Sequence, residues 1–361
     1  MRITPDEALG AGGLELAVVE RLPLRGNEHV GVIKRRGLRI ALGICIPLII
    51  IIAAALAVVM KYGPTFGFYL VPPSAERYGK DALATIGKSG IYSGSDEWKS
   101  TYEECLKMIE NAESYEDTYP AIKKALSVCG GKHSMLMTKS ESQDITESYD
   151  EVLPTVSLDG DIAIIKLPDF LVTAEDFLGT AEAGQKYAKV AEDFIHENRD
   201  KIKGVVLDLR GNTGGDMGPM ATAVSSLLPD GELVYYHYRS YDIPVTLKNG
   251  VVSNAGTGGR SLYPEEKLNV PVAILTDDMT ASSGEALTLC FRGLENTRTF
   301  GAPTAGYTSV NMLHNMYDGA QMYLTVAFDK ARTGEIFKET SIEPDVATDS
   351  PLEAALEWLR S

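Results

Sequence analysis

The feature that most constrains this chain is an uncharged apolar run from Ile40 to Met60, IALGICIPLIIIIAAALAVVM. As a helix rising 1.5 Å per residue, the run would be about 31 Å long, which matches the hydrocarbon core of a bilayer. A cleaved signal peptide is the alternative, because the ALA sequence at 55–57 resembles a cleavage site. However, the run starts far from the N-terminus and exceeds the usual apolar region of a signal peptide. We therefore expect a transmembrane helix over residues 38–60.

Basic residues flank this run unequally. Four of them precede it closely, and only Lys61 stands near its other end; the four are Lys34, Arg35, Arg36 and Arg39. Because cytoplasmic flanks carry the excess of Lys and Arg, we expect residues 1–37 to be a cytoplasmic, mostly flexible tail. The protein would then be a single-pass protein of the cell membrane with the remainder outside the cytoplasm.

The charge of the chain is divided in the same way. Residues 1–61 carry a net charge of +3, and since the whole chain carries −16, the rest carries −19. Phosphate backbones would be repelled by so acidic a domain, which excludes nucleic acid as a partner. Basic or peptide-like substrates fit the acidity better, although acidity also keeps an exported domain soluble.

Beyond the membrane, the pattern indicates three regions. Residues 61–74 contain three prolines and are expected to form a stalk, and residues 75–150 read as a helical subdomain with apolar residues at helical spacing. Residues 151–361 alternate buried apolar strands with helices. The expected strands are 161–171, 204–211, 232–240, 270–277, 298–301 and 320–328, and the expected helices include 182–201, 219–228 and 282–294. This alternation predicts an α/β fold with helices on a largely parallel sheet.

Two strand-to-helix turns carry the chemistry. In VVLDLRGNTGGDMG an apolar strand runs into three closely spaced glycines, whose backbone N–H groups can face an anion. In VAILTDDMTASSGEALTL a second strand is followed by a short loop and a helix that starts near Ser282 and Ser283. A serine there faces the positive end of the helix dipole, although serine is also a common helix cap. No phosphate-loop, CxxC or HExxH pattern occurs, so neither a nucleotide, a metal nor another cofactor is expected.

Taken together, VVLDLRGNTGG, TASSGE, FGAPTAG and IEPDV resemble, in this order, the carboxy-terminal processing and tricorn-core serine peptidases. The resemblance spans about residues 130–345 and implies a crotonase-like catalytic core. It also implies that Ser282, three residues before Glu285, is the nucleophile. Oxyanion-hole N–H groups would come from Ser283 and the pair Gly214-Gly215. Too few residues separate the helical region from the core for the PDZ domain that many of these peptidases carry.

The general base follows less directly. Tyr307 occupies the position of the lysine that the bacterial processing peptidases use, so a Ser-Lys dyad is not expected. The tricorn-like branch uses a histidine after its helical region, and GGKHSML offers His133 at the matching place, although Lys132 replaces the usual glycine. His314 is the alternative among the five histidines.

Further residues are implied by the resemblance as orienting the base. An acidic residue precedes the xPDV element in the tricorn-like pattern, and FKETSIEPDV offers Glu339, with Glu343 as the alternative. Ser134 matches a serine that some members use for the same purpose. Separately, Cys105 and Cys129 would be able to form a disulfide in an oxidising exterior, but their spacing does not require one.

The sequence therefore predicts a membrane-anchored, extracytoplasmic serine endopeptidase that forms an acyl-enzyme on Ser282. Two other classes remain open. One is a catalytically inactive ligand- or peptide-binding module of the same fold, which the missing lysine makes conceivable. The other is an acyl-CoA enzyme of crotonase type, which the serine at the turn and the outside location disfavour.

Overall fold

The computed structural model describes residues 27–63, 68–148, 152–171 and 180–361, and side chains from residue 43 onward. The chain divides into two compact units, residues 1–59 and 60–361. Helix α1 (Asn27–Tyr62) contains the apolar run. Its segment Gly43–Tyr62 has a mean hydropathy of 2.9 and no buried residue, so by length and composition it is able to cross a membrane.

Helix α1 is longer than the sequence predicts. It begins eleven residues before the expected start at residue 38, so residues 27–37 are helical rather than flexible. The basic residues there are good helix formers and extend the apolar helix without a break. Residues 1–26 of the expected tail lie outside the described part, as do residues 64–67 of the expected stalk.

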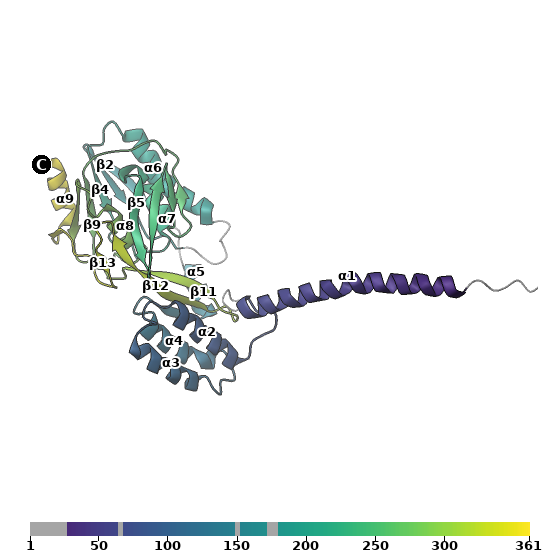
Figure 1. The fold of residues 1–361 in the computed structure, drawn as a ribbon. Helices are drawn as coiled ribbons and strands as arrows, with labels where there is room; N and C mark the ends of the chain where they lie inside the picture. The colour runs from purple at the N-terminus through teal and green to yellow at the C-terminus, as the bar shows by residue number, and fades with distance from the viewer. Residues whose placement is uncertain (1–26, 64–67, 149–151, 172–179) are drawn as a thin grey trace, which may run out of the picture. The chain divides into compact units, whose positions relative to one another are not determined.

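The helical subdomain consists of α2 (Ala75–Ser89), α3 (Asp96–Met108) and α4 (Tyr119–Cys129), with a short 3-10 turn at Glu116–Thr118 before α4. Ser74 and Ser95 cap the first two helices by accepting hydrogen bonds from backbone N–H groups at 3.3 and 3.1 Å. The apolar faces of the three helices form one core with alternate residues of strand β12 (Gln321–Ala331), and Figure 1 shows the helices gathered along β12 and β11 (Ser309–Asn315). The subdomain is thus continuous with the sheet that follows.

A six-stranded sheet forms the centre of the α/β core, in the order β14-β10-β9-β4-β3-β2. All its pairings are parallel except that of β2 with β3. Its strands are β2 (Thr155–Asp159), β3 (Ile162–Lys166), β4 (Gly204–Asp208), β9 (Val272–Thr276), β10 (Thr297–Gly301) and β14 (Val346–Ala347). This sheet is the α/β fold expected from the alternating apolar segments.

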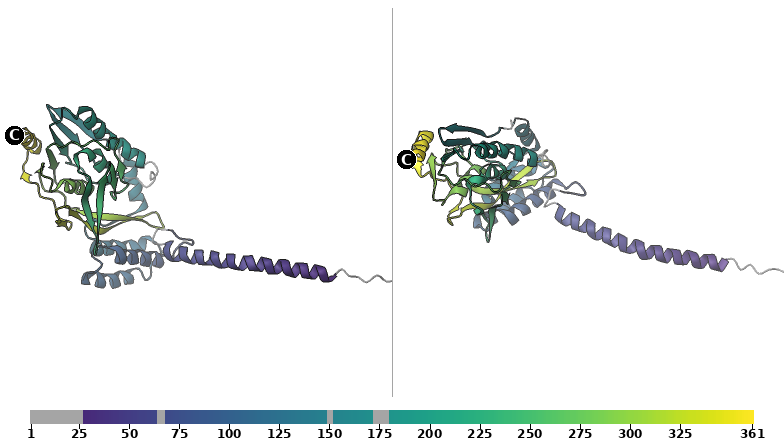
Figure 2. Two further views of the ribbon diagram at one scale, coloured as in Figure 1. Left: turned by 45° about the horizontal axis from the view of Figure 1, so that its top comes forward. Right: turned by 90° about the horizontal axis from the view of Figure 1, so that it is seen from above.

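Helices cover both faces of this sheet. One face packs with α6 (Thr180–Asn198), α7 (Met217–Ala223) and α8 (Ser283–Phe291) in the largest apolar cluster. The other face packs against α9 (Pro351–Arg360), which lies on the outside of the core in both views of Figure 2. Helix α7 is shorter than the expected 219–228 because its last turn becomes a 3-10 helix at Ser225–Leu227.

A second, eight-stranded antiparallel sheet was not expected. Strand β12 is its longest member and pairs with β1, β5, β11 and β13. The strands are β1 (Met135–Met137), β5 (Gly231–His237), β6 (Asp242–Lys248), β7 (Val251–Ser253), β8 (Gly259–Arg260), β11 (Ser309–Asn315), β12 (Gln321–Ala331) and β13 (Ile336–Phe337). Several are short, and β11 alternates poorly because both of its faces are partly exposed. Two of its strands, β5 and β12, correspond to the expected strands at 232–240 and 320–328, whereas the short strands leave little signal in the sequence.

Helix α5 (Lys139–Ser148) follows β1 and lies beside β11 and β12 in Figure 1. The two cysteines of the helical subdomain are both buried free thiols. Cys105 Sγ donates to Ala121 O at 3.3 Å and Cys129 Sγ to Ile86 O at 3.2 Å. The two thiols therefore serve separate backbone carbonyls rather than each other.

Candidate active site

The two glycine- and serine-bearing turns emerge side by side. Strands β4 and β9 are parallel neighbours, so the turns that follow them leave the same edge of the sheet. Gly211 N–H donates to Asp277 Oδ1 at 3.1 Å, and Ala281 N–H donates to Asn212 O at 2.9 Å. These two hydrogen bonds hold the turns together and fix the position of Ser282 and Ser283.

Ser282 stands at the N-cap of α8 in a strained backbone conformation, with φ of 52° and ψ of −115°. Such a left-handed φ is uncommon for a residue with a side chain and is found where the surroundings enforce it. A Cβ atom added to Gly214, itself at φ of 111°, would lie 2.7 Å from Ser282 Cβ. Glycine at this position is therefore what lets the first turn approach the serine.

Glu285 holds this conformation from inside the core. The side chain is fully buried, and its Oε2 accepts from the backbone N–H groups of Ser282 at 2.9 Å and Tyr307 at 2.7 Å. Its Oε1 accepts from Gly306 N–H at 2.8 Å and from the Thr304 hydroxyl. Burial raises the pKa of the carboxyl group, and the four hydrogen bonds oppose that rise. One carboxylate thus ties the serine turn to the loop that carries Tyr307.

The glycine turn is organised by a buried asparagine. Asn212 Oδ1 accepts from Gly214 N–H at 2.9 Å, and its Nδ2 donates to Leu167 O at 3.0 Å. Three residues were expected to supply N–H groups to an oxyanion hole, and the N–H of one of them, Gly214, is therefore already bound to Asn212. Ser283 Oγ donates to Gly215 O at 2.5 Å, which brings the other two residues together. A Cβ added to Gly215 would come within 2.0 Å of a backbone oxygen, so this position also requires glycine.

His133 lies in the turn between α4 and β1, after Gly131 at φ of 77°. Its Nδ1 is 3.0 Å from Ser309 Oγ, and its ring meets Tyr307 edge to face with 5.1 Å between ring centroids. Burial, opposed by a hydrogen bond to Ser309 and assisted by the nearby charge of Lys132, lowers the pKa of His133 to about 4. The imidazole is therefore neutral at physiological pH, the form that a general base needs.

The structure links His133 to Ser282 through Tyr307. The ring of Tyr307 contacts the imidazole, and its backbone N–H shares Glu285 Oε2 with the N–H of Ser282. Lys132 Nζ lies 4.8 Å from the centroid of the same tyrosine ring. The residue that stands in place of the expected lysine thus connects the two halves of the candidate site.

The expected orienting residues occupy different places. Glu339, at φ of 54°, accepts the backbone N–H of His133 at 3.1 Å and therefore contacts the turn rather than the ring. Ser134 Oγ donates to Thr325 Oγ1 at 3.1 Å and accepts from Thr325 N–H at 2.8 Å, away from the imidazole. Glu343 is exposed, and no hydrogen bond of its carboxylate is found among the described residues.

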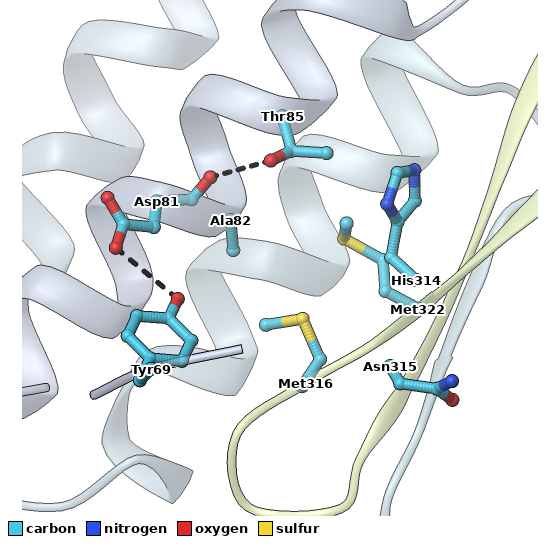
Figure 3. Close-up of a pocket in the computed structure, with 8 residues that line it drawn as sticks. All are labelled: Tyr69, Asp81, Ala82, Thr85, His314, Asn315, Met316 and Met322. Carbon is cyan, nitrogen blue, oxygen red and sulfur yellow. Dashed lines mark hydrogen bonds between the residues drawn. The ribbon is translucent and has the colours of Figure 1, made fainter. Parts of the chain in front are cut away.

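The alternative histidine lies elsewhere. His314 is five residues along β11 from Ser309, about 16 Å at 3.3 Å per residue. It lines a small pocket between β11, β12 and α2 with Met316, Met322 and Ala82, and Figure 3 shows this group. The structure therefore brings His133, and not His314, to the loop of Tyr307.

Two residues of this site were missed by the sequence analysis. Ser309 is a serine in a weakly patterned strand, and only the pairing of β11 with β12 reveals it beside the imidazole. Asn212 stands inside the quoted RGNTGG turn, where an asparagine between glycines is itself a signal for side-chain hydrogen bonds to the backbone.

These features define a class of site: a strained serine at a helix start lies opposite a glycine turn, and a neutral histidine is joined to it through the loop of Tyr307. The sequence profile of peptidase family S41 matches residues 161–348, just over half of the chain. The chain belongs to this family, that of the carboxy-terminal processing peptidases.

Individual relatives agree with this assignment. A nisin-resistance protein from Lactococcus lactis subsp. lactis is 36% identical over 90% of this chain and 98% of its own length. The structure of a lipoprotein from Streptococcus agalactiae is 31% identical, with a TM-score of 0.70 over 81% of this chain and 98% of that one. The photosystem II D1 C-terminal processing protease, 16% identical with a TM-score of 0.51 over 80% of this chain and 98% of its own, shares the fold.

Proposed function

We propose that this protein is a membrane-anchored serine endopeptidase that hydrolyses peptide bonds through an acyl-enzyme on Ser282, with His133 as general base. The observation that carries the proposal is that Glu285 Oε2 accepts hydrogen bonds from the backbone N–H groups of both Ser282, at 2.9 Å, and Tyr307, at 2.7 Å. The ring of Tyr307 in turn contacts the imidazole of His133. A strained serine and a neutral imidazole are thereby organised by one buried carboxylate.

The proposed reaction uses the two nitrogens of His133 separately. Ser309 Oγ accepts from Nδ1–H, which leaves the lone pair on Nε2 to take the proton from Ser282 Oγ as that oxygen attacks the peptide carbonyl carbon. The C–N bond then breaks while Nε2–H protonates the leaving amine. A water molecule, deprotonated by Nε2, attacks the acyl-enzyme and restores Ser282. In this scheme Ser309 and Glu339 are positioning residues for the ring and for its turn.

The oxyanion formed in these steps requires fixed donors. We assign them to the backbone N–H groups of Gly215 and Ser283, because Gly214 N–H is already bound to Asn212. Ser283 stands in the first turn of α8, where backbone N–H groups have no partner within the helix and the helix dipole favours negative charge. The hydrogen bond from Ser283 Oγ to Gly215 O holds these two residues against each other.

A serine-directed fluorophosphonate probe tests this proposal on the full-length protein in detergent. We expect the wild type to be labelled and Ser282→Ala to lose labelling and peptide cleavage, because among the described residues Ser282 is the one serine with a left-handed φ. Ser283→Ala is the control in the next position and should still be labelled, although more slowly, since it keeps the backbone N–H assigned to the oxyanion hole and loses only the hydrogen bond from its side chain to Gly215 O. Equal labelling of wild type and Ser282→Ala, or an unreactive wild type, contradicts the proposal and favours an inactive binding module.

The family implies peptide or protein substrates, and we propose a basic peptide for this chain. Residues 62–361 carry a net charge of −19, which attracts cationic peptides at moderate ionic strength. A relative that covers nearly the whole chain is named for nisin resistance, so nisin is a suitable first substrate. Cleavage of nisin that weakens steeply with added salt is expected, and a rate independent of salt would argue against electrostatic attraction.

We also propose the arrangement of the whole chain. Residues 1–37 would be cytoplasmic, 38–60 would cross the membrane, 61–74 would form the juxtamembrane stalk, 75–150 the helical subdomain and 151–361 a crotonase-like peptidase core. The apolar segment Gly43–Tyr62 and the basic flank before it support the anchor and its direction. Protease added to intact cells should digest the core and spare an N-terminal tag; the reverse pattern would overturn the orientation.

A further inference from the structure

Three strands next to the candidate base place one row of side chains on a common face. Tyr323 of β12 pairs with Met135 of β1 on one side and with Leu313 of β11 on the other. Directly paired residues of antiparallel strands project to the same face of a sheet. The Met135–Tyr323–Leu313 row therefore forms a continuous strip across the three strands.

The opposite face of β1 and β12 is already occupied. Leu136, Met322 and Leu324 alternate with the row and are buried in the core shared with α2, α3 and α4. In contrast, Met135 is 45% exposed and Leu313 is 44% exposed. Two large apolar side chains are thus presented to solvent on the face of β1 and β11 that does not pack in this core.

The exposed row lies between two boundaries. Towards the candidate base, Asn311 Nδ2 donates to His133 O at 2.8 Å and joins β11 to the turn of the histidine. At the other end, Ser142 of α5 donates to Gln321 Oε1 at 3.0 Å, and Tyr323 OH donates to the same oxygen at 3.1 Å. Because its hydroxyl is turned to Gln321, Tyr323 contributes its ring to the row.

We propose that the Met135–Tyr323–Leu313 row is a substrate subsite that binds one large apolar side chain of an extended peptide. This inference rests on the proposed function, since the peptide is placed by cleavage near His133. Leu313 lies four residues beyond Ser309, the partner of the imidazole, along β11, and it shares its face of the strand with Asn311, which donates to His133 O. That spacing is about 13 Å along a strand at 3.3 Å per residue. An extended peptide advances by the same length per residue, so the apolar side chain should stand about four residues from the cleaved bond.

A series of polar, basic peptides with a single leucine moved stepwise along the sequence tests this register. For the full-length wild type in detergent, kcat/KM should peak when the leucine lies about four residues from the cleaved bond. Leu313→Ser should lower that peak about tenfold, mainly through KM, because burying a leucine side chain against apolar neighbours is worth a factor of this order. A profile without a peak near this position overturns the subsite.

Met312→Ser is the matched control. Met312 is the adjacent residue of the same strand, is 43% exposed, and projects to the opposite face. It should leave the leucine profile unchanged. The rate of fluorophosphonate labelling, which needs no peptide subsite, shows whether a loss in Leu313→Ser arises at Ser282 or in peptide binding. Equal effects of the two serine substitutions overturn the proposal.

A binding measurement separates this inference from the proposed function. In the Ser282→Ala background, a fluorescent form of the best leucine peptide should bind, and adding Leu313→Ser should weaken its Kd about tenfold while adding Met312→Ser does not. Peptide binding that is weakened by Leu313→Ser and not by Met312→Ser supports the subsite, even where the wild type fails to cleave the peptide. In that case only the peptidase proposal is overturned. Absence of binding, or equal binding by all three proteins, overturns the subsite even where the wild type does cleave.

Discussion

Replacing Glu285 by glutamine tests whether one buried carboxylate organises the candidate site. Each carboxylate oxygen accepts two hydrogen bonds, Oε2 from Ser282 and Tyr307, and Oε1 from Gly306 and Thr304. A glutamine amide satisfies one pair, and its NH2 group must face the other. The less costly orientation turns NH2 towards Thr304, whose hydroxyl is able to accept, and leaves the Gly306 N–H without an acceptor.

The expected loss can be estimated from these contacts. Removing one hydrogen bond to a charged acceptor costs about 1.5–3 kcal/mol, and the remaining bonds weaken because the acceptor becomes neutral. Relief of the buried charge offsets part of this, because burial already raises the pKa of Glu285. We expect Glu285→Gln to lower the free energy of unfolding by about 2–4 kcal/mol, and to slow fluorophosphonate labelling of Ser282.

Urea unfolding of the full-length protein in detergent, followed by the fluorescence of Trp98 and Trp358, measures this change. Glu343→Gln is the matched control, because Glu343 is an exposed glutamate of the same family pattern. It should remain within about 0.5 kcal/mol of the wild type. A loss below about 1 kcal/mol in Glu285→Gln, with labelling at the wild-type rate, would refute the role assigned to this carboxylate.

Two further predictions concern titration. The acid limb of the kcat/KM profile should lie near pH 4, because the pKa of His133 is lowered to about 4. Lys132→Gln should move this limb to higher pH, because it removes a neighbouring positive charge. A limb near pH 6.5 in the wild type would contradict this assignment. Burial raises the pKa of Asp329 well above its usual value, so the folded protein loses stability as pH rises above the pKa of the unfolded carboxyl group, about 3.9. Asp329→Asn has no carboxyl group and lacks this penalty. Thermal unfolding should therefore show the variant gaining stability over the wild type as the pH rises from 4 to 8. A stability difference that stays constant over this range would show that Asp329 ionises in the folded protein as readily as in the unfolded one.

Several elements could be predicted because their signals are local. The apolar run appears as the membrane-length segment Gly43–Tyr62. Strands β4 and β9 are buried at every position, and such continuous apolar strands between helices identify a parallel sheet. The two turns at their ends were expected to lie together, and the parallel pairing of these strands places them at one edge.

Other contacts join residues that no local pattern relates. Ser309 reaches the His133 ring across 176 positions of sequence, and Glu339 reaches the backbone of His133 across 206. Both depend on the eight-stranded antiparallel sheet, in which β11 is half-exposed and has no clear period. The sequence therefore indicated His133 and Glu339. It predicted that Glu339 or Ser134 would orient the His133 ring, whereas Ser309 contacts it.

By itself, the sequence determined the apolar helix, the α/β alternation and the turn that carries Ser282, because each depends on neighbouring residues and the backbone geometry they favour. Only the tertiary structure decided how these parts are connected. It showed that Gly214 N–H is engaged by Asn212, that Glu285 holds two loops at once, and that Ser309 contacts the imidazole. Hydrogen bonds between distant segments are set by how the sheets pair and pack, which is a property of the folded chain as a whole.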